Sequence, residues 1–367
     1  MKQTLQITVL LWLIFSLTSC KVGRFIYYNF ADIDDHNIFP SRLIENGDRV
    51  FNFKIPGKEK VPKQITYDSQ INSFEPFLEE NKTVAFLIIQ NDTIQYENYW
   101  HGYEQGSIVP SFSMAKSVTS MLIGCAIDDG LIDAVEDPIT KYIPDLDKNE
   151  FGSTSIKQLL NMTSGLEFNE SYINPLGDAA TFYYGRRLRK STLNLEIDEN
   201  KVNRFKYSSG NSQLLGLLLE NVLDSKDVSS YLEEKIWKPL GMEYDASWSI
   251  DRKNNGLEKT FCCLNARARD YAKLGRLYLN KGNWNGSQIV SQEWVNNSTK
   301  VDITDGSAWY YQYQWWLPTD SGDFMAHGIL GQYIYVNPQK NLIIVRLGKK
   351  EGDVEWEQIF TTLAAAY

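Results

Sequence analysis

The chain has 367 residues, of which 43% are hydrophobic, 13% aromatic and 23% charged. This composition is too apolar and too aromatic for a disordered chain, and the length suits one large or two interlocked domains with a substantial core. The formal net charge of −9 gives no basic surface of the kind that nucleic-acid binding needs, so nucleic-acid partners are excluded.

The first predicted element is a secretory signal peptide over residues 1–19. Lys2 supplies a positive start, residues 9–15 form an apolar core, and residues 17–20 read Leu-Thr-Ser-Cys. This ending resembles the bacterial lipobox, which predicts that Cys20 is acylated and becomes the first residue of the mature chain. The alternative is an ordinary signal peptide with a chance cysteine. The lipobox interpretation predicts an exported protein of the bacterial cell envelope, anchored to the membrane on its periplasmic or surface side.

The other cysteines, Cys125, Cys262 and Cys263, do not indicate a disulfide framework. Adjacent cysteines rarely bridge each other, and three cysteines cannot all pair. Cys125 lies in an apolar helical stretch and is predicted to be a small core residue. The sequence has only three histidines and no zinc-binding, phosphate-loop or EF-hand pattern, so we expect no metal and no cofactor.

Residues 20–72 are mixed in character and interrupted by prolines, which predicts an extended lead-in from the anchor to a folded domain over residues 73–367. Strands are predicted over residues 83–89 and 94–100, on either side of a turn. Helical spacing then begins, and we expect an inserted, mostly helical subdomain over about residues 114–260.

Strands return at residues 310–317, 333–336 and 342–347, and a final helix is predicted over residues 356–366. Strands at both ends of the chain with helices between them predict an α+β architecture. In it, an antiparallel sheet is built from both termini, with flanking helices and the inserted helical part. A functional cleft is expected between the two parts.

Residues 113–116 form the only Ser-x-x-Lys sequence in the chain. Positions i and i+3 share a helix face, so the Oγ of Ser113 and the Nζ of Lys116 can converge. A desolvated lysine can act as the base that activates a serine hydroxyl, and a helix start offers backbone N–H groups to a developing oxyanion. Because about one such tetrapeptide is expected by chance in a chain of this length, the alternative is a capping serine beside a solvated lysine.

The surroundings of this tetrapeptide resemble a known family. The matching segments are residues 110–117, 158–165, 205–211, 265–272 and 327–332. In this order and spacing they look like serine hydrolases of the class C β-lactamase-like family, and most of all like 6-aminohexanoate-dimer hydrolases and family VIII carboxylesterases. The resemblance spans about residue 83 to the C-terminus and implies a β-lactamase/transpeptidase-like fold that works through an acyl-enzyme.

The resemblance implies that Ser113 is the nucleophile, Lys116 the general base and Tyr207 the proton relay to the leaving group. Lys116 is then the cation expected to lower the pKa of Tyr207. The sequence departs from the family pattern at Ser209, where β-lactamases carry Asn. The Ser-x-Asn sequence from Ser209 to Asn211 also fits penicillin-binding proteins, so Ser209 stays open as an alternative to Tyr207. Ser209 and Asn211 are candidate substrate-binding residues.

The last matching segment begins with His327, Gly328 and Ile329, near where β-lactamases carry Lys-Thr-Gly. The resemblance implies that the N–H of Ile329 joins that of Ser113 in an oxyanion hole, a task that needs only backbone and a glycine for close approach. The missing lysine argues against efficient β-lactam turnover. His327 either replaces it in part or is a hydrogen-bonded strand histidine, and Gly328 is a further candidate for substrate binding.

The sequence leaves three functions open. The leading hypothesis is an exported serine hydrolase that cleaves a small ester, amide or peptide-like substrate through an acyl-enzyme. The second is DD-peptidase, penicillin-binding or β-lactamase activity, which the envelope location favours and the missing lysine disfavours. The third is a non-catalytic surface binding protein with this fold. The presence of Ser113, Lys116 and Tyr207 together disfavours it, because a protein that only binds does not need all three.

Overall fold

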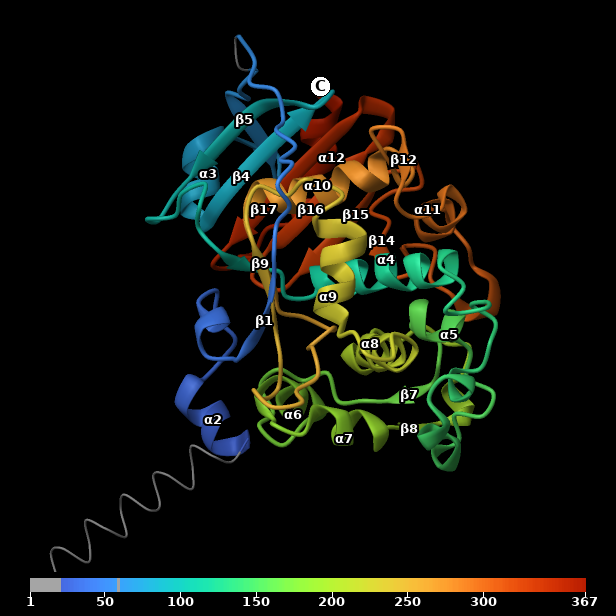
Figure 1. The fold of residues 1–367 in the computed structure, drawn as a ribbon. Helices are drawn as coiled ribbons and strands as arrows, with labels where there is room; N and C mark the ends of the chain where they lie inside the picture. Colours follow the sequence, from blue (N-terminus) through green and yellow to red (C-terminus); the bar gives the residue numbers. More distant parts are fainter. Residues whose placement is uncertain (1–20, 58–59) are drawn as a thin grey trace, which may run out of the picture.

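A computed structural model describes residues 21–57 and 60–367. At its centre lies a seven-stranded antiparallel sheet in the order β13-β14-β15-β16-β17-β4-β5 (Figure 1). Strand β4 (Thr83–Gln90), from the first third of the chain, pairs with β17 (Leu342–Gly348), from its end. The two ends of the chain therefore share one sheet, and the predicted α+β architecture is confirmed.

Both faces of this sheet are covered, which explains why β4 and β17 read as almost continuous apolar runs. Alternate side chains of β4 enter two separate cores, such as Leu87 in one and Phe86 in the other. One face packs against α4 (Met114–Asp128) and α10 (Ala268–Leu279), and the opposite face against α3 (Phe74–Glu80) and α12 (Trp356–Ala365). The other strands of the sheet are β5 (Thr93–Tyr99), β13 (Tyr311–Gln312), β14 (Trp315–Trp316), β15 (Phe324–Gly328) and β16 (Gln332–Asn337).

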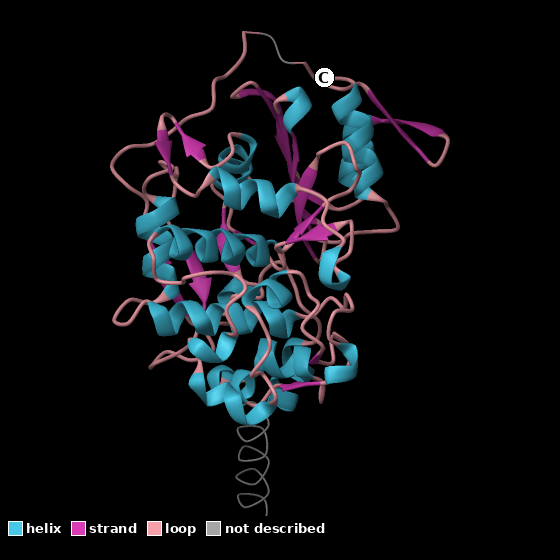
Figure 2. Ribbon diagram, turned by 90° about the vertical axis from the view of Figure 1, so that its right-hand side faces the viewer, coloured by secondary structure: helices cyan, strands magenta, loops and turns pink. Residues whose placement is uncertain are grey.

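A mostly helical part follows α4, and Figure 2 shows helices of the chain gathered away from the central sheet. Its central helix, α8 (Ser209–Val222), packs against α4 and α5. The other helices of this part are α5 (Ile156–Leu160), α6 (Asp178–Tyr184), α7 (Leu188–Leu193) and α9 (Val228–Leu232) with a π-helical turn at Glu233–Trp237. The later helix α11 (Gln292–Thr299) instead packs against β13 and β14 of the central sheet. β7 (Leu166–Glu167) pairs antiparallel with β8 (Glu196–Ile197) after the chain has passed through α6 and α7. β11 (Asn283–Trp284) and β12 (Ser287–Gln288) form a short hairpin.

A second sheet, in the order β1-β9-β10-β6, joins the two parts. Its strands are β1 (Ser41–Ile44), β6 (Val109–Pro110), β9 (Ala246–Ser249) and β10 (Leu264–Ala266). The extended lead-in predicted for residues 20–72 is thus wrong in detail. Its described residues contain β1, the helix α2 (Lys21–Tyr28) and a hairpin of β2 (Gln64–Tyr67) and β3 (Gln70–Ser73). Within the described ranges, no helix is long and apolar enough to cross a membrane.

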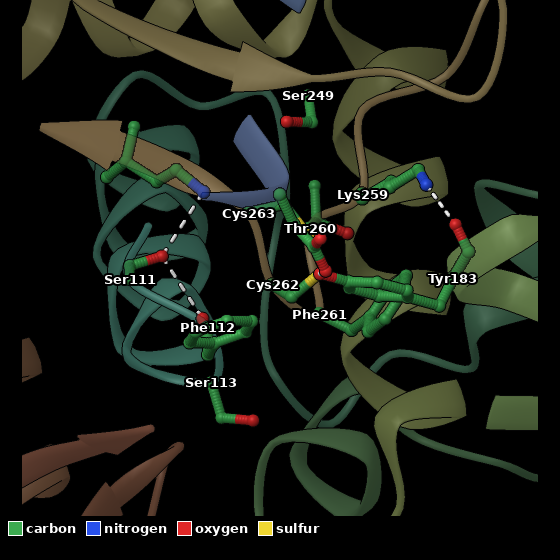
Figure 3. The surroundings of a disulfide bond; sticks show 12 residues. Ser111, Phe112, Ser113, Tyr183, Ser249, Lys259, Thr260, Phe261, Cys262 and Cys263 are labelled. Atoms are coloured by element: carbon green, nitrogen blue, oxygen red, sulfur yellow. Dashed lines mark hydrogen bonds between the residues drawn. A yellow bond between two sulfur atoms is a disulfide. The ribbon is translucent and has the colours of Figure 1, made fainter. Parts of the chain in front are cut away.

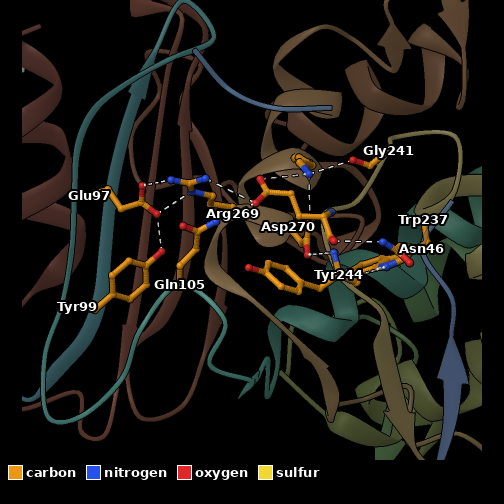
Figure 4. Close-up of polar contacts among 11 residues, drawn as sticks. Asn46, Glu97, Tyr99, Gln105, Trp237, Gly241, Tyr244, Arg269 and Asp270 are labelled. Atoms are coloured by element: carbon orange, nitrogen blue, oxygen red, sulfur yellow. Dashed lines mark hydrogen bonds and ion pairs between the residues drawn. The ribbon is translucent and has the colours of Figure 1, made fainter. Parts of the chain in front are cut away.

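A polar network fixes the start of α10 between the sheet and the insertion (Figure 4). Arg269 donates two hydrogen bonds to Glu97 of β5, at 2.8 and 2.6 Å. The fully buried Asp270 accepts from the backbone N–H of Glu243 at 2.7 Å and from Lys273 at 3.1 Å. Residues 265–272, one of the segments that resemble the family, therefore have a structural role and do not reach the candidate active site around Ser113.

Candidate active site

Ser113 lies at a sharp turn between β6 and α4. Phe112, the residue before it, has a φ of 43°, in the left-handed region that costs a bulky side chain energy. Ser111 holds the turn on β10, because its N–H donates to the carbonyl of Leu264 at 2.7 Å and its hydroxyl accepts from the N–H of Leu264 at 3.2 Å. Ser113 is the N-cap of α4, but its hydroxyl makes no capping bond to the described backbone. The hydroxyl is thus left for another partner.

That partner is Lys116, one helical turn further on. Its Nζ lies 3.0 Å from the Oγ of Ser113, 3.1 Å from the Oγ of Ser209 and 2.8 Å from the carbonyl oxygen of Phe261. The side chain is buried, which rules out the solvated lysine considered from sequence. Burial lowers the pKa of Lys116 to about 8, although the nearby Glu170 carboxylate acts in the opposite direction. A neutral Lys116 can accept a proton from Ser113 along their hydrogen bond.

Tyr207 lies beside the same pair. Lys116 Nζ is 5.1 Å from the centroid of the Tyr207 ring. Burial and the Glu170 carboxylate raise the pKa of the Tyr207 hydroxyl above its ordinary value, and they outweigh the Ser113 side chain, which lowers it. The expectation that Lys116 lowers this pKa is wrong, because desolvation of the phenol dominates. Tyr207 therefore remains a neutral phenol that can donate a proton.

Sequence reasoning missed one member of the site, Glu170. The carboxylate accepts from the hydroxyl of Ser209 at 2.5 Å, from the backbone N–H of Ser209 at 2.8 Å and from the hydroxyl of Tyr172 at 2.8 Å. Lys116, Ser209 and Glu170 thus form one hydrogen-bonded chain. Glu170 lies in a loop after β7 with no motif around it, so no local signal could have identified it.

Gly328, the last residue of β15, brings the sheet edge against the candidate nucleophile. A Cβ atom at this position would lie 2.4 Å from the carbonyl oxygen of Ser111 and 3.0 Å from the backbone nitrogen of Ser113. Only glycine allows this approach. The next residue, Ile329, lines the same cavity as Ser113, and its role in an oxyanion hole stays a prediction.

The structure places two other candidates outside this cavity. His327 hydrogen-bonds Glu351 at 3.1 Å and stacks on Tyr333, with ring centroids 4.4 Å apart. It lines a separate hollow, because successive residues of β15 point to opposite faces of the sheet. Asn211 is buried, with its oxygen accepting from Ser164 at 2.6 Å and its amide donating to the sulfur of Met162 at 3.3 Å.

The model of the Beta-lactamase family matches residues 72–366. The chain belongs to the beta-lactamase family. It is 28% identical over 313 residues to the 6-aminohexanoate-dimer hydrolase of Paenarthrobacter ureafaciens, with 79% of this chain and 78% of that protein covered. The family and this relative indicate that the chain is an enzyme, a serine hydrolase.

Solved structures share the fold of this beta-lactamase family member. A Bacillus anthracis protein named as a candidate 6-aminohexanoate-dimer hydrolase matches with a TM-score of 0.80 at 22% identity, over 91% of this chain and 92% of that chain. A family VIII carboxylesterase matches with a TM-score of 0.62 at 15% identity, over 80% and 95% of the two chains. At these identities the likeness establishes the β-lactamase/transpeptidase-like fold that the sequence predicted.

The hydrolase has a cavity of about 330 Å³ beside Ser113, within the usual size range of small-molecule sites. Ser113, Ser209 and Ile329 contribute to its wall. The rest of the lining is mainly aromatic and apolar: Phe25, Phe30, Ala31, Phe112, Tyr172, Ala179, Ala180, Tyr183, Tyr184, Phe261, Cys262 and Leu330. Lys350 and Glu351 are the charged residues in the described lining.

A disulfide joins Cys262 to Cys263 next to this cavity (Figure 3), which corrects the expectation that these adjacent cysteines do not bridge. The sequence does not reveal this bridge, because it depends on the backbone conformation of the pair. Cys263 adopts a left-handed φ of 71° in a tight turn. The pair directly follows Phe261, whose carbonyl accepts the bond from Lys116. Cys125 is a free, buried thiol, as predicted.

Proposed function

We propose that this enzyme is an exported serine hydrolase that cleaves a small ester or amide through an acyl-enzyme on Ser113. One observation carries the proposal. The buried Nζ of Lys116 lies 3.0 Å from the Oγ of Ser113, and burial lowers its pKa to about 8. An appreciable fraction of Lys116 is then neutral near pH 7, so the lysine can act as the general base.

The geometry supports a two-step reaction. Ser113 Oγ attacks the substrate carbonyl carbon while its proton passes to Lys116, and the backbone N–H groups of Ser113 and Ile329 bind the oxyanion. The intermediate then collapses, the bond to the leaving group breaks, and Tyr207 donates the proton that the leaving group needs and regains one from Lys116, which becomes neutral again. Water attacks the acyl-enzyme in the second step and gives up its proton to Lys116. The lysine returns this proton to the Oγ of Ser113 as the acyl bond breaks and the product acid leaves.

The relatives support a small ester or amide as the substrate. One is named a 6-aminohexanoate-dimer hydrolase, and a structural neighbour is named a family VIII carboxylesterase. His327, at the position of the missing lysine, does not line the cavity and hydrogen-bonds Glu351. No described side chain at that position offers a cation to a β-lactam carboxylate.

One observation favours DD-peptidase or penicillin-binding activity as a second candidate. The hydroxyl of Ser209 lies 3.1 Å from the Nζ of Lys116, within reach of the reacting centre. This position suits the serine of a Ser-x-Asn element. However, Ser209 donates its own proton to Glu170, which makes it less suited to protonate a leaving group.

The location of the enzyme is part of the proposal. Cys20 lies outside the described residues, and the first described residue, Lys21, begins α2. The lipobox-like ending of residues 17–20 supports acylation of Cys20 and attachment to the membrane of the cell envelope.

Two activity probes test the function directly. A fluorophosphonate should label the wild type and leave Ser113→Ala unlabelled, while a fluorescent penicillin should label neither. Ser113 is half-buried at a helix start, so its replacement should keep the fold, which circular dichroism can check. Labelling of the wild type by the penicillin would favour the peptidase, and labelling by neither probe would favour the binding protein.

A further inference from the structure

One wall of the cavity beside Ser113 comes from the N-terminal segment, residues 21–31. Phe25 of α2 and the following Phe30 and Ala31 all line the cavity. These residues precede the part of the chain that the family model matches, residues 72–366. The wall therefore lies outside the part of the chain that the family model matches.

This segment is held on α6 by specific contacts. The buried guanidinium of Arg24 donates to the carbonyl oxygen of Tyr184 at 2.9 Å, and the hydroxyl of Tyr184 donates to the carbonyl of Asn29 at 2.9 Å. The rings of Phe25 and Tyr184 meet edge to face, with centroids 5.6 Å apart. Lys21 donates to the hydroxyl of Thr181 at 2.5 Å. The segment is thus fastened along its length, and Figure 1 shows α2 beside α6.

The cavity and Tyr207 lie on different sides of Ser113. The ring of Tyr207 packs with those of Tyr311 and Trp316, at centroid distances of 5.9 and 5.7 Å, and none of these three residues lines the cavity. In the proposed reaction Tyr207 protonates the leaving group, so the leaving group occupies the side of these aromatic rings. The acyl part of the substrate then enters the cavity beside Phe25 and Phe30.

The chemistry of the cavity indicates which acyl groups fit. Phe25, Ala179 and Ala180 are buried residues of its lining and offer no hydrogen-bonding side chain. Phe30 is 52% exposed and Tyr172 is 46% exposed, so these two rings stand at the mouth. An apolar acyl chain that runs from the mouth into the cavity would bury its surface away from water, which is favourable by the hydrophobic effect.

We propose that residues 21–31 form an acyl-binding wall and that the preferred substrates are esters or amides of apolar, medium-length acids. The proposal rests on the hydrolase function proposed above. Each methylene that enters the cavity should increase kcat/KM until the cavity is filled. A short acid such as acetate cannot reach the wall, so its esters should not depend on Phe30.

Nitrophenyl esters of acetate, butyrate and octanoate test the wall with one constant leaving group. We expect the wild type to prefer octanoate over acetate, and Phe30→Ala to lower kcat/KM for octanoate about 10-fold, as expected for losing the contact of one or two methylenes. The acetate value should change less than about twofold. Tyr27→Ala is the matched control, because Tyr27 is 72% exposed in the same N-terminal segment and does not line the cavity. Equal losses for acetate and octanoate, or no loss, would overturn the proposal.

A binding measurement separates this proposal from the hydrolase function. In a Ser113→Ala background, quenching of tryptophan fluorescence reports the binding of nitrophenyl octanoate without turnover. Adding Phe30→Ala should weaken binding about 10-fold, whereas adding Tyr27→Ala should not. Unchanged affinity in the Phe30 variant would refute the acyl wall even in an active enzyme. If the fluorophosphonate does not label the wild type, the hydrolase function is refuted. A difference in octanoate binding between the Phe30 and Tyr27 variants would still support the acyl-binding wall.

Discussion

Ser209 donates two hydrogen bonds to Glu170, one from its hydroxyl at 2.5 Å and one from its backbone N–H at 2.8 Å. The same hydroxyl accepts from Lys116 at 3.1 Å. A carboxylate is therefore connected to the candidate base through one intervening serine. Its negative charge favours the ammonium form of Lys116 and raises the pKa of that lysine, against the stronger lowering by burial.

The first prediction concerns Glu170→Gln. The amide removes the charge that stabilises protonated Lys116, so the pKa of Lys116 should fall and the acidic limb of the kcat/KM profile should move to lower pH. Glu167→Gln is the matched control, because Glu167 is an exposed residue that pairs with Lys201. A pH profile measured on an activated ester decides the matter. An acidic limb that stays in place would show that Glu170 does not influence the base.

The second prediction concerns Lys116 itself. The base works only when neutral, so kcat/KM should rise with pH and level off above the pKa of about 8. Well below that value it should fall about tenfold per pH unit, because the neutral fraction does. Lys116→Ala should lose about 10²–10⁴-fold in rate. This loss should not add to that of Ser113→Ala, because both residues serve one step. Near-normal turnover of an activated ester by the lysine variant would contradict the assignment.

The sheet and the Ser113–Lys116 pair were predictable because short-range patterns determine them. The apolar runs of β4 and β17 indicated buried strands, and the i, i+3 spacing placed Ser113 and Lys116 on one helix face. The alternation of strand residues could also have shown that His327 does not enter the site. Gly328 faces Ser113, so the side chain of its neighbour His327 lies on the opposite face of the sheet.

Other parts of the site depend on contacts between distant segments, and no local pattern encodes them. Glu170 reaches Ser209 across 39 residues. Arg24 reaches Tyr184 across 160 residues to place α2 on the cavity. The direction of the Tyr207 pKa was missed for a related reason. It depends on how far the folded chain excludes water from the phenol, which the presence of a neighbouring lysine does not reveal.

The third prediction concerns Gly328→Ala. The new Cβ would lie 2.4 Å from the carbonyl oxygen of Ser111 and 3.0 Å from the backbone nitrogen of Ser113, and backbone atoms cannot easily move aside. The strand end should shift and misplace the N–H of Ile329, which should lower kcat about 10²–10³-fold, as for loss of an oxyanion donor. Gly106→Ala is the control, because nothing lies within 4 Å of a Cβ there. Comparable kcat values for the two variants would argue against an oxyanion hole at this strand end.

The fourth prediction concerns Cys20, which lies outside the described residues. If residues 17–20 act as a lipobox, the mature chain begins with an acylated Cys20 and is recovered with membranes. Mass spectrometry of the mature N-terminus should therefore show a lipid on Cys20, and Cys20→Ala should abolish it. A mature chain that begins at another residue without a lipid would contradict the anchor.

The fifth prediction separates the two candidates for the proton relay. Tyr207→Phe keeps the ring and its packing against Trp316 but removes the hydroxyl that would donate the proton. If Tyr207 is the relay, this change should slow turnover about 10²–10⁴-fold. The loss should be larger for an amide than for a nitrophenyl ester, because an amine leaving group must be protonated and a nitrophenolate need not be.

Ser209→Ala is the matching variant. It removes one acceptor from Lys116 and one donor to Glu170, but the backbone N–H of residue 209 can still bind the carboxylate. Its loss should therefore be mild on both substrates if Tyr207 carries the proton. If Ser209 carries it instead, the order reverses: Ser209→Ala becomes inactive and Tyr207→Phe stays near normal. Rates of both variants on one amide and one activated ester distinguish these outcomes, and the reversed order would refute the role of Tyr207.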